Sequence, residues 1–127
     1  MDRFLWICFA GALGTGTRYL VGLWAGKALG TAFPFGTLIV NIVGCFLIAL
    51  VMQISLSTTL LSPTVRLTLT TGFMGGLTTY SSFNYETTRL LQGGAWGTGL
   101  LNVALTTSVC FVAGLLGMLL ARKLAGA

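Results

Sequence analysis

A polar stretch with two adjacent glycines interrupts an apolar segment that is otherwise long enough to span a bilayer. Residues 72–86 read GFMGGLTTYSSFNYE, and seven of these side chains carry a hydroxyl or an amide. A glycine pair loosens a helix, and the backbone groups it frees cannot stay unpaired in lipid. A broken helix at membrane depth is tolerated only where it is buried in protein or lines a water-filled cavity. We therefore expect a helix break near Gly75–Thr79 that faces a pore or an ion.

The side chains near this break that could coordinate an ion are uncharged. Phe83 follows Tyr80 by three residues, so both rings share one helix face, and an aromatic ring is electropositive along its edge. Two ring edges with amide and hydroxyl donors beside them could coordinate a small anion, whereas a fixed full charge would hold it too tightly for conduction. The donors that we consider are Asn41, Thr78, Thr79, Tyr80, Ser81, Ser82, Asn102 and Thr106.

Three of these donors have an alternative, purely structural interpretation. A lone asparagine in a membrane span such as Asn41 often holds helices together, and its amide can equally donate to an anion. Asn102 and Thr106 are four residues apart and share a helix face, but a hydroxyl in a span often bonds to its own helix.

The composition excludes most other chemistry. The chain has no histidine and only two carboxylates, Asp2 and Glu86, which removes most acid–base, catalytic-triad and metalloenzyme schemes. We therefore predict that it is not an enzyme. The three cysteines, Cys8, Cys45 and Cys110, are widely spaced in apolar runs and are expected to pack as small apolar residues. The seven basic residues are scattered along the chain, a pattern that does not favour nucleic-acid binding.

The elements that must position these residues are membrane-spanning helices. The chain is 55% hydrophobic and 7% charged, a composition typical of an integral membrane protein. A spanning helix needs about 20 apolar residues, so four spans with short loops use up the 127 residues. We predict an all-α membrane protein in which residues 1–127 form a single four-helix domain. The four spans are expected at about residues 4–29, 36–54, 64–91 and 96–120.

The charged residues leave the orientation of the chain open. Basic residues are only weakly biased between the two sides of a four-span topology, which is compatible with insertion in both directions and hence with an antiparallel homodimer. Arg18 lies well inside the first span, where a cation is costly. It either extends to the membrane surface, pairs with Glu86 or meets an anion. Glu86 could instead pair with Arg89 or face water.

The sequence resembles the Fluc/CrcB family of small fluoride channels. The resemblance covers essentially the whole chain and rests on GTGTRYLVG at 14–22, GTLIVNIVG at 36–44 and GFMGGLTTYSSFNYET at 72–87. It implies a fluoride-selective channel that passively exports fluoride to reduce its toxicity. It also implies a dual-topology homodimer with two pores, embedded in the lipid of the bacterial inner membrane as a multi-pass protein.

The resemblance also implies which residues form the site. Asn41 matches the pore asparagine of the second span, and Phe83 matches the second phenylalanine of an aromatic box whose first member is here Tyr80. The phenol hydroxyl at that position could add a donor or narrow the path. Cys110 occupies a second family position for a hydroxyl on the fourth span. The fluoride pore is thus expected at Arg18, Asn41, Tyr80, Ser82, Phe83 and Thr106.

A structural sodium ion at the dimer centre is a further implication of the resemblance. The matching positions are Gly75 and Thr78, through their backbone carbonyls. A broken helix frees carbonyl groups, hard cations take oxygen ligands, and a two-fold axis would double the number of ligands.

Two other functions are alternatives to the channel. A proton-coupled exporter of the small multidrug-resistance type is similar in size, but it needs a buried acidic residue in the first span, where this chain has none. A non-transporting membrane assembly protein would explain the small-residue faces but not the polar break.

Overall fold

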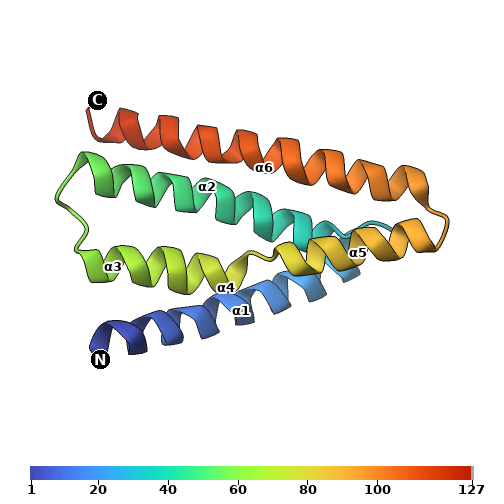
Figure 1. Ribbon diagram of the computed structural model, residues 1–127, viewed down its shortest axis with the longest axis horizontal. Helices are drawn as coiled ribbons and strands as arrows, with labels where there is room; N and C mark the ends of the chain where they lie inside the picture. The colour runs from blue at the N-terminus through green and yellow to red at the C-terminus, as the bar shows by residue number, and fades with distance from the viewer. Residues whose placement is uncertain (127) are drawn as a thin grey trace.

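The computed structural model describes residues 1–126, and within this range every regular element is a helix (Figure 1). The elements in chain order are α1 (Asp2–Leu29), α2 (Phe35–Ser57), α3 (Pro63–Leu67), η1 (Thr68–Met74), α4 (Gly75–Leu77), α5 (Tyr80–Gln92) and α6 (Trp96–Leu124). Helices α1, α2 and α6 are each long and apolar enough to cross a membrane. The prediction of an all-α membrane protein is confirmed at this level, and three predicted spans coincide with these helices to within a few residues.

The remaining predicted span, at residues 64–91, is a stack of shorter helices rather than one long helix. It runs alongside the three long helices from one end of the molecule to the other (Figure 1). A π-helical segment, η1, leads into the single turn of α4, and the chain is then extended at Thr78 (ψ 155°) and Thr79 (ψ 113°) before α5 begins. The predicted break near Gly75–Thr79 is therefore present.

The glycine pair is not itself the break, which corrects the sequence interpretation. Gly75 has helical angles (φ −61°, ψ −37°) and both glycines belong to α4. Their neighbourhood instead serves close packing against α1. A methyl group on Gly76 would overlap Gly11 O, and one on Gly72 would lie 2.8 Å from Ile7 O. The glycines allow the backbones of two helices to touch.

The turns place both termini at one end of the molecule, together with the α2–α3 connection (Figure 1). Pro34 occupies the N-cap of α2. Ser62 caps α3 by accepting a hydrogen bond from Val65 N at 3.3 Å. Because both termini lie at the same end, the chain runs the length of the molecule an even number of times.

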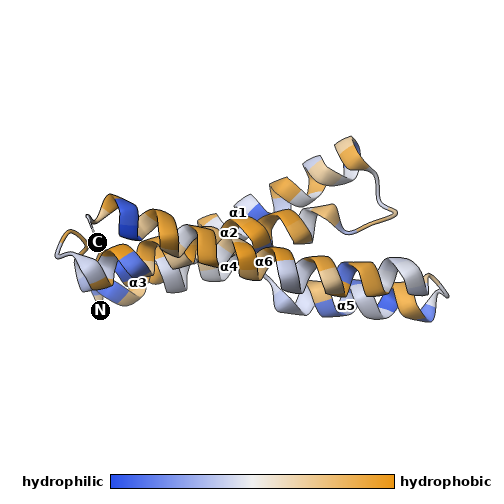
Figure 2. Cartoon of the chain, turned by 90° about the horizontal axis from the view of Figure 1, so that it is seen from above, coloured by the Kyte–Doolittle hydropathy of each residue, from blue (hydrophilic) through white to orange (hydrophobic). Residues whose placement is uncertain are grey.

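The polarity of the elements differs sharply along the molecule. Orange, hydrophobic residues dominate α1, α2 and α6, whereas α5 is mostly white and blue (Figure 2). The same view shows the α1–α2 end diverging from the α5–α6 end. The polar half of the broken segment is thus the one that follows the break and packs on α6.

Candidate functional site

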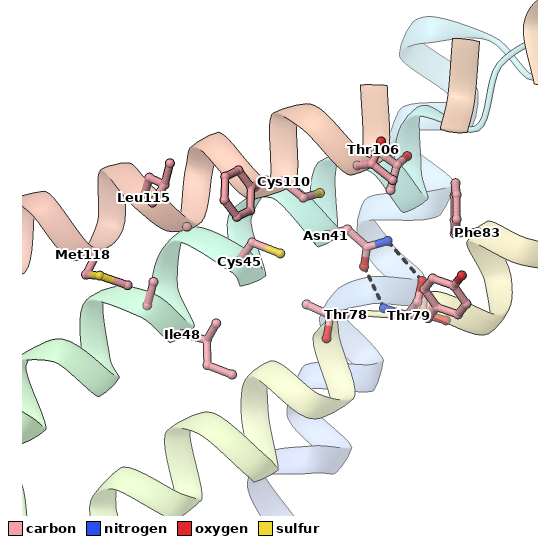
Figure 3. Close-up of a pocket in the computed structure, with 15 residues that line it drawn as sticks. Asn41, Cys45, Ile48, Thr78, Thr79, Phe83, Thr106, Cys110, Leu115 and Met118 are labelled. Carbon is pink, nitrogen blue, oxygen red and sulfur yellow. Dashed lines mark hydrogen bonds between the residues drawn. The ribbon is translucent and has the colours of Figure 1, made fainter. Parts of the chain in front are cut away.

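A groove of about 630 Å³ opens between α2, the helix break, α5 and α6 (Figure 3). Its residues come from segments far apart in the sequence. At one end the lining is polar, and towards the other end it becomes apolar through residues such as Ile48 and Leu115. The polar or aromatic residues that line it include Asn41, Cys45, Thr78, Thr79, Tyr80, Phe83, Thr106 and Cys110. Four of the six predicted pore residues (Asn41, Tyr80, Phe83 and Thr106) therefore lie along one groove.

Asn41 bridges α2 and the helix break. Its Nδ2 donates to Thr79 O at 3.1 Å, and its Oδ1 accepts from Thr79 N at 2.8 Å. Both backbone groups of the extended residue are thereby satisfied in a buried position, as burial requires. Asn41 holds the break in place, and its second amide hydrogen is the one left for another acceptor.

Thr79 in turn caps the helix that follows. Its Oγ1 accepts from Ser82 N at 3.1 Å and lies 3.0 Å from Ser82 Oγ. This is the hydroxyl N-cap arrangement that starts many helices. Ser82 is therefore engaged by the cap and is not among the residues that line the groove.

The break redirects two N–H groups and so frees two carbonyls. In an uninterrupted helix, Thr79 N would donate to Gly75 O and Ser82 N to Thr78 O. Here Thr79 N donates to Asn41 Oδ1, and Ser82 N donates to Thr79 Oγ1. The carbonyls of Gly75 and Thr78 thus lose their regular partners, which is the condition for oxygen ligation of a hard cation.

The two aromatic residues differ in exposure. The ring centroids of Tyr80 and Phe83 lie 5.5 Å apart with an interplanar angle of 59°. Phe83 is 7% exposed, whereas Tyr80 is 79% exposed on the surface of the single chain. The tilted pair can present ring edges to the groove, with Phe83 fixed by packing and Tyr80 at the open side.

A buried chain of hydrogen bonds joins α5 to α6 behind Phe83. Thr106 Oγ1 donates to Asn102 Oδ1 (3.4 Å), Asn102 Nδ2 donates to Thr87 Oγ1 (2.9 Å), and Thr87 Oγ1 donates to Phe83 O (2.7 Å). Asn102 is 1% exposed and does not line the groove, so its expected place among the groove donors is wrong. Thr87 was missed by sequence reasoning, although its spacing of four residues from Phe83 was a usable signal.

Arg18 and Glu86 lie outside this groove. Arg18 is half-buried on α1, and it does not line the groove. Glu86 Oε1 accepts a hydrogen bond from Thr37 Oγ1 at 2.7 Å. Glu86 lines a separate cavity of about 450 Å³ near the α1–α2 turn, together with Arg89. Within residues 1–126, Glu86 hydrogen-bonds to Thr37 and to neither Arg18 nor Arg89, the two arginines considered as its partners.

Comparisons with known proteins converge on one family. A family model described as "CrcB-like protein, Camphor Resistance (CrcB)" matches residues 5–118. The chain is 52% identical over 124 residues to the fluoride-specific ion channel FluC of Sorangium cellulosum, covering 98% of each chain. It is 49% identical over 118 residues to the protein of that name from Geobacter metallireducens, covering 93% of this chain and 95% of the relative. The FluC of Anaeromyxobacter sp. is 48% identical over 126 residues, with 99% and 100% covered. These names describe ion channels rather than enzymes.

Proposed function

The chain belongs to the CrcB family, and from this premise we propose that it is a fluoride-selective channel whose pathway follows the groove between α2, α5 and α6. The channel exports fluoride passively and so lowers its toxicity in the cell. The protein is a multi-pass protein of the bacterial inner membrane. The stack of α3, η1, α4 and α5 supplies the fourth crossing, so that residues 1–127 form one channel subunit.

The observation that carries this proposal is the combination of groups in one groove. Asn41, Thr106 and the Tyr80–Phe83 pair line the same space. The donors are neutral and are largely engaged by the chain itself, so an anion meets only weak contacts. Weak, multiple sites are what conduction needs.

The groove is incomplete in a single chain, and a second copy would close it. Tyr80 is 79% exposed and Phe111, another lining residue, is 70% exposed. An antiparallel homodimer, inserted in both topologies, would cover these rings with a second copy and produce two pores. The weak charge asymmetry of the chain supports insertion in both directions.

The freed carbonyls of Gly75 and Thr78 fit a structural sodium ion at the dimer centre. Their regular hydrogen-bond donors are taken by Asn41 and Thr79, and Gly75 is exposed on the single chain. When bound, the ion would tie the two breaks together through oxygen ligands. Replacing sodium by a large organic cation during purification should then weaken the dimer, and unchanged dimerisation would count against the site.

The test of the function is ion flux from liposomes. Protein reconstituted in liposomes should release fluoride rapidly, as recorded with a fluoride electrode, and should release chloride far more slowly. Equal rates for the two halides would refute fluoride selectivity.

A variant ties the flux to the groove. Phe83→Ile removes a ring edge but keeps apolar bulk, so it should abolish fluoride release while the protein still elutes as a dimer. Leu120→Ile, on the exposed surface of α6, is the control. Retained flux in Phe83→Ile would reject the aromatic role without rejecting the channel.

A further inference from the structure

Two of the three cysteines, which the sequence places far apart, meet in the wall of the groove. Cys45 on α2 and Cys110 on α6 both line it, and these two helices pack directly against each other. Figure 3 shows the two sulfur atoms projecting from their helices towards the same space, on the side where Asn41 lies. The third cysteine, Cys8, is exposed on α1 and does not line the groove.

The surroundings of this pair select for soft cations. Ile48, Phe111 and Leu115 are apolar neighbours in the lining, and a hard cation would find no carboxylate there. Within residues 1–126, no group of three or more histidine, cysteine or acidic side chains gathers as a metal-ligand cluster. A tetrahedral zinc site, which needs four such ligands, is therefore not available. Two sulfur ligands suit a thiophilic cation that accepts two-fold coordination.

We propose that Cys45 and Cys110 form a two-thiol site for a soft divalent cation of the mercuric class, and that its occupancy closes the groove. Two S–H bonds break, two metal–sulfur bonds form, and two protons leave to water. The product carries no net charge, because two thiolates balance a divalent cation. A neutral product matters at this depth, since burying an uncompensated charge is costly.

The closure depends on the position of the pair. The two thiols lie on the groove wall between the polar end, at Asn41 and Thr106, and the apolar end, at Leu115 and Met118. A metal held between α2 and α6 would occupy the space that an anion must pass. This second half of the proposal rests on the proposed channel function, whereas the binding half does not.

The binding half is tested on purified protein without any flux. The Cys8→Ser protein keeps the pair and is incubated with mercuric chloride, challenged with glutathione and weighed intact by mass spectrometry. One mercury per chain should be retained. Adding Cys45→Ser or Cys110→Ser should lower the glutathione concentration that strips the metal by about a hundredfold, because a second ligand on the same scaffold raises the effective concentration.

Clear results would overturn the binding half. Two mercury ions per chain in the Cys8→Ser protein, or equal retention in the single-thiol proteins, would show that the cysteines act separately. Serine is nearly isosteric with cysteine, and the elution volume of each variant checks its fold. If a serine variant elutes as aggregate, the corresponding alanine variant takes its place in the same assay.

The closure is tested by fluoride release from liposomes. Loading the Cys8→Ser protein with mercury should slow release at least about tenfold, and a dithiol should restore it by chelation. The protein that also carries Cys110→Ser should release fluoride at the same rate with and without mercury. Mercury retained by the pair with no change in release would refute closure. No release from unloaded protein would instead refute the channel function and leave the binding result to stand.

Discussion

Two contacts within the same bundle are built on opposite principles. Where α1 meets η1 and α4, glycines on both sides bring the backbones together, as at Gly14 against Phe73 O and at Gly76 against Gly11 O. Where the helix break and α5 face α2 and α6, larger polar and aromatic side chains line a groove of about 630 Å³, although α2 and α6 also touch each other closely at Gly117 against Phe46 O. We call the first contact the glycine seam. The helices of the glycine seam touch because glycine has no side chain, whereas the groove is lined by larger side chains.

The two regions also differ in what stabilises them: backbone contact in one and side-chain hydrogen bonds in the other. The glycine seam depends on close backbone approach, which strengthens dispersion contacts between helices in lipid. The groove depends on side chains that satisfy buried polar groups: Asn41 bonds the Thr79 backbone in the wall, and Asn102 bonds Thr87 behind it. A wall whose donors are already engaged binds an anion weakly. Close packing on one side of the break thus coexists with an open groove on the other.

The largest effect is expected in the glycine seam. Gly14→Ala places a methyl group onto Phe73 O and 2.9 Å from Leu77 N, both backbone atoms that cannot move aside. Overpacking of this kind costs about 3 kcal/mol, which corresponds to a fall in Tm of about 10 °C for a chain of this size. Gly16→Ala is the matched control, because nothing lies within 4 Å of its methyl position on the same helix. Thermal unfolding in detergent measures both, and equal midpoints would contradict the seam.

The next effect tests the support of the helix break. Asn41→Leu leaves Thr79 N–H buried without a partner, at a cost of about 2 kcal/mol, and fluoride release should be lost with it. Gln53→Leu is the control, since this amide of the same helix donates only to the exposed Ser57 Oγ. Thermal midpoints and liposome flux are compared for the two variants. An Asn41→Leu protein as stable as Gln53→Leu would mean that Asn41 does not hold the break.

Much of this architecture could be predicted from local patterns. Long apolar runs predicted α1, α2 and α6, and the glycine pair with the polar run after it predicted the break. The role of the glycine pair could not be read in the same way. A glycine can serve either a turn or a close approach between helices, and only the neighbouring helix decides which. Gly76 faces α1 across a contact between distant parts of the chain, so its sequence context did not reveal its role.

The residues of the candidate site were easier to predict from the sequence than their hydrogen-bond partners. Asn41, Tyr80, Phe83 and Thr106 were selected for their chemistry and do line one groove. Their hydrogen-bond partners depend on how the break and α5 pack on α2 and α6, which sequence spacing does not give. Asn102 was therefore misplaced as a groove donor. Thr37, as the partner of Glu86, was not anticipated for the same reason.

A smaller effect is expected from the hydrogen-bonded support behind Phe83. Thr87→Val keeps the shape of the side chain but removes the hydroxyl that joins Asn102 Nδ2 to Phe83 O. The loss should cost about 1 kcal/mol and slow fluoride release several-fold, because Phe83 loses its positioning. Thr17→Val removes a hydroxyl that donates only to Leu13 O of its own helix and should change neither quantity. Unchanged flux in Thr87→Val would show that packing alone positions Phe83.

The smallest effect is expected at Gly75, which is next to Gly76 in the chain but takes no part in the glycine seam. Gly76→Ala should destabilise the protein like Gly14→Ala, because its methyl group would overlap Gly11 O. Gly75→Ala, one residue earlier, would place its methyl group 3.8 Å from Thr70 O, an ordinary contact. Its cost to the fold should stay within about 0.5 kcal/mol, measured as the thermal midpoint in sodium-free detergent. If the two alanines were equally damaging under these conditions, the helix turn itself would require both glycines, and close contact with α1 would not explain the cost at Gly76.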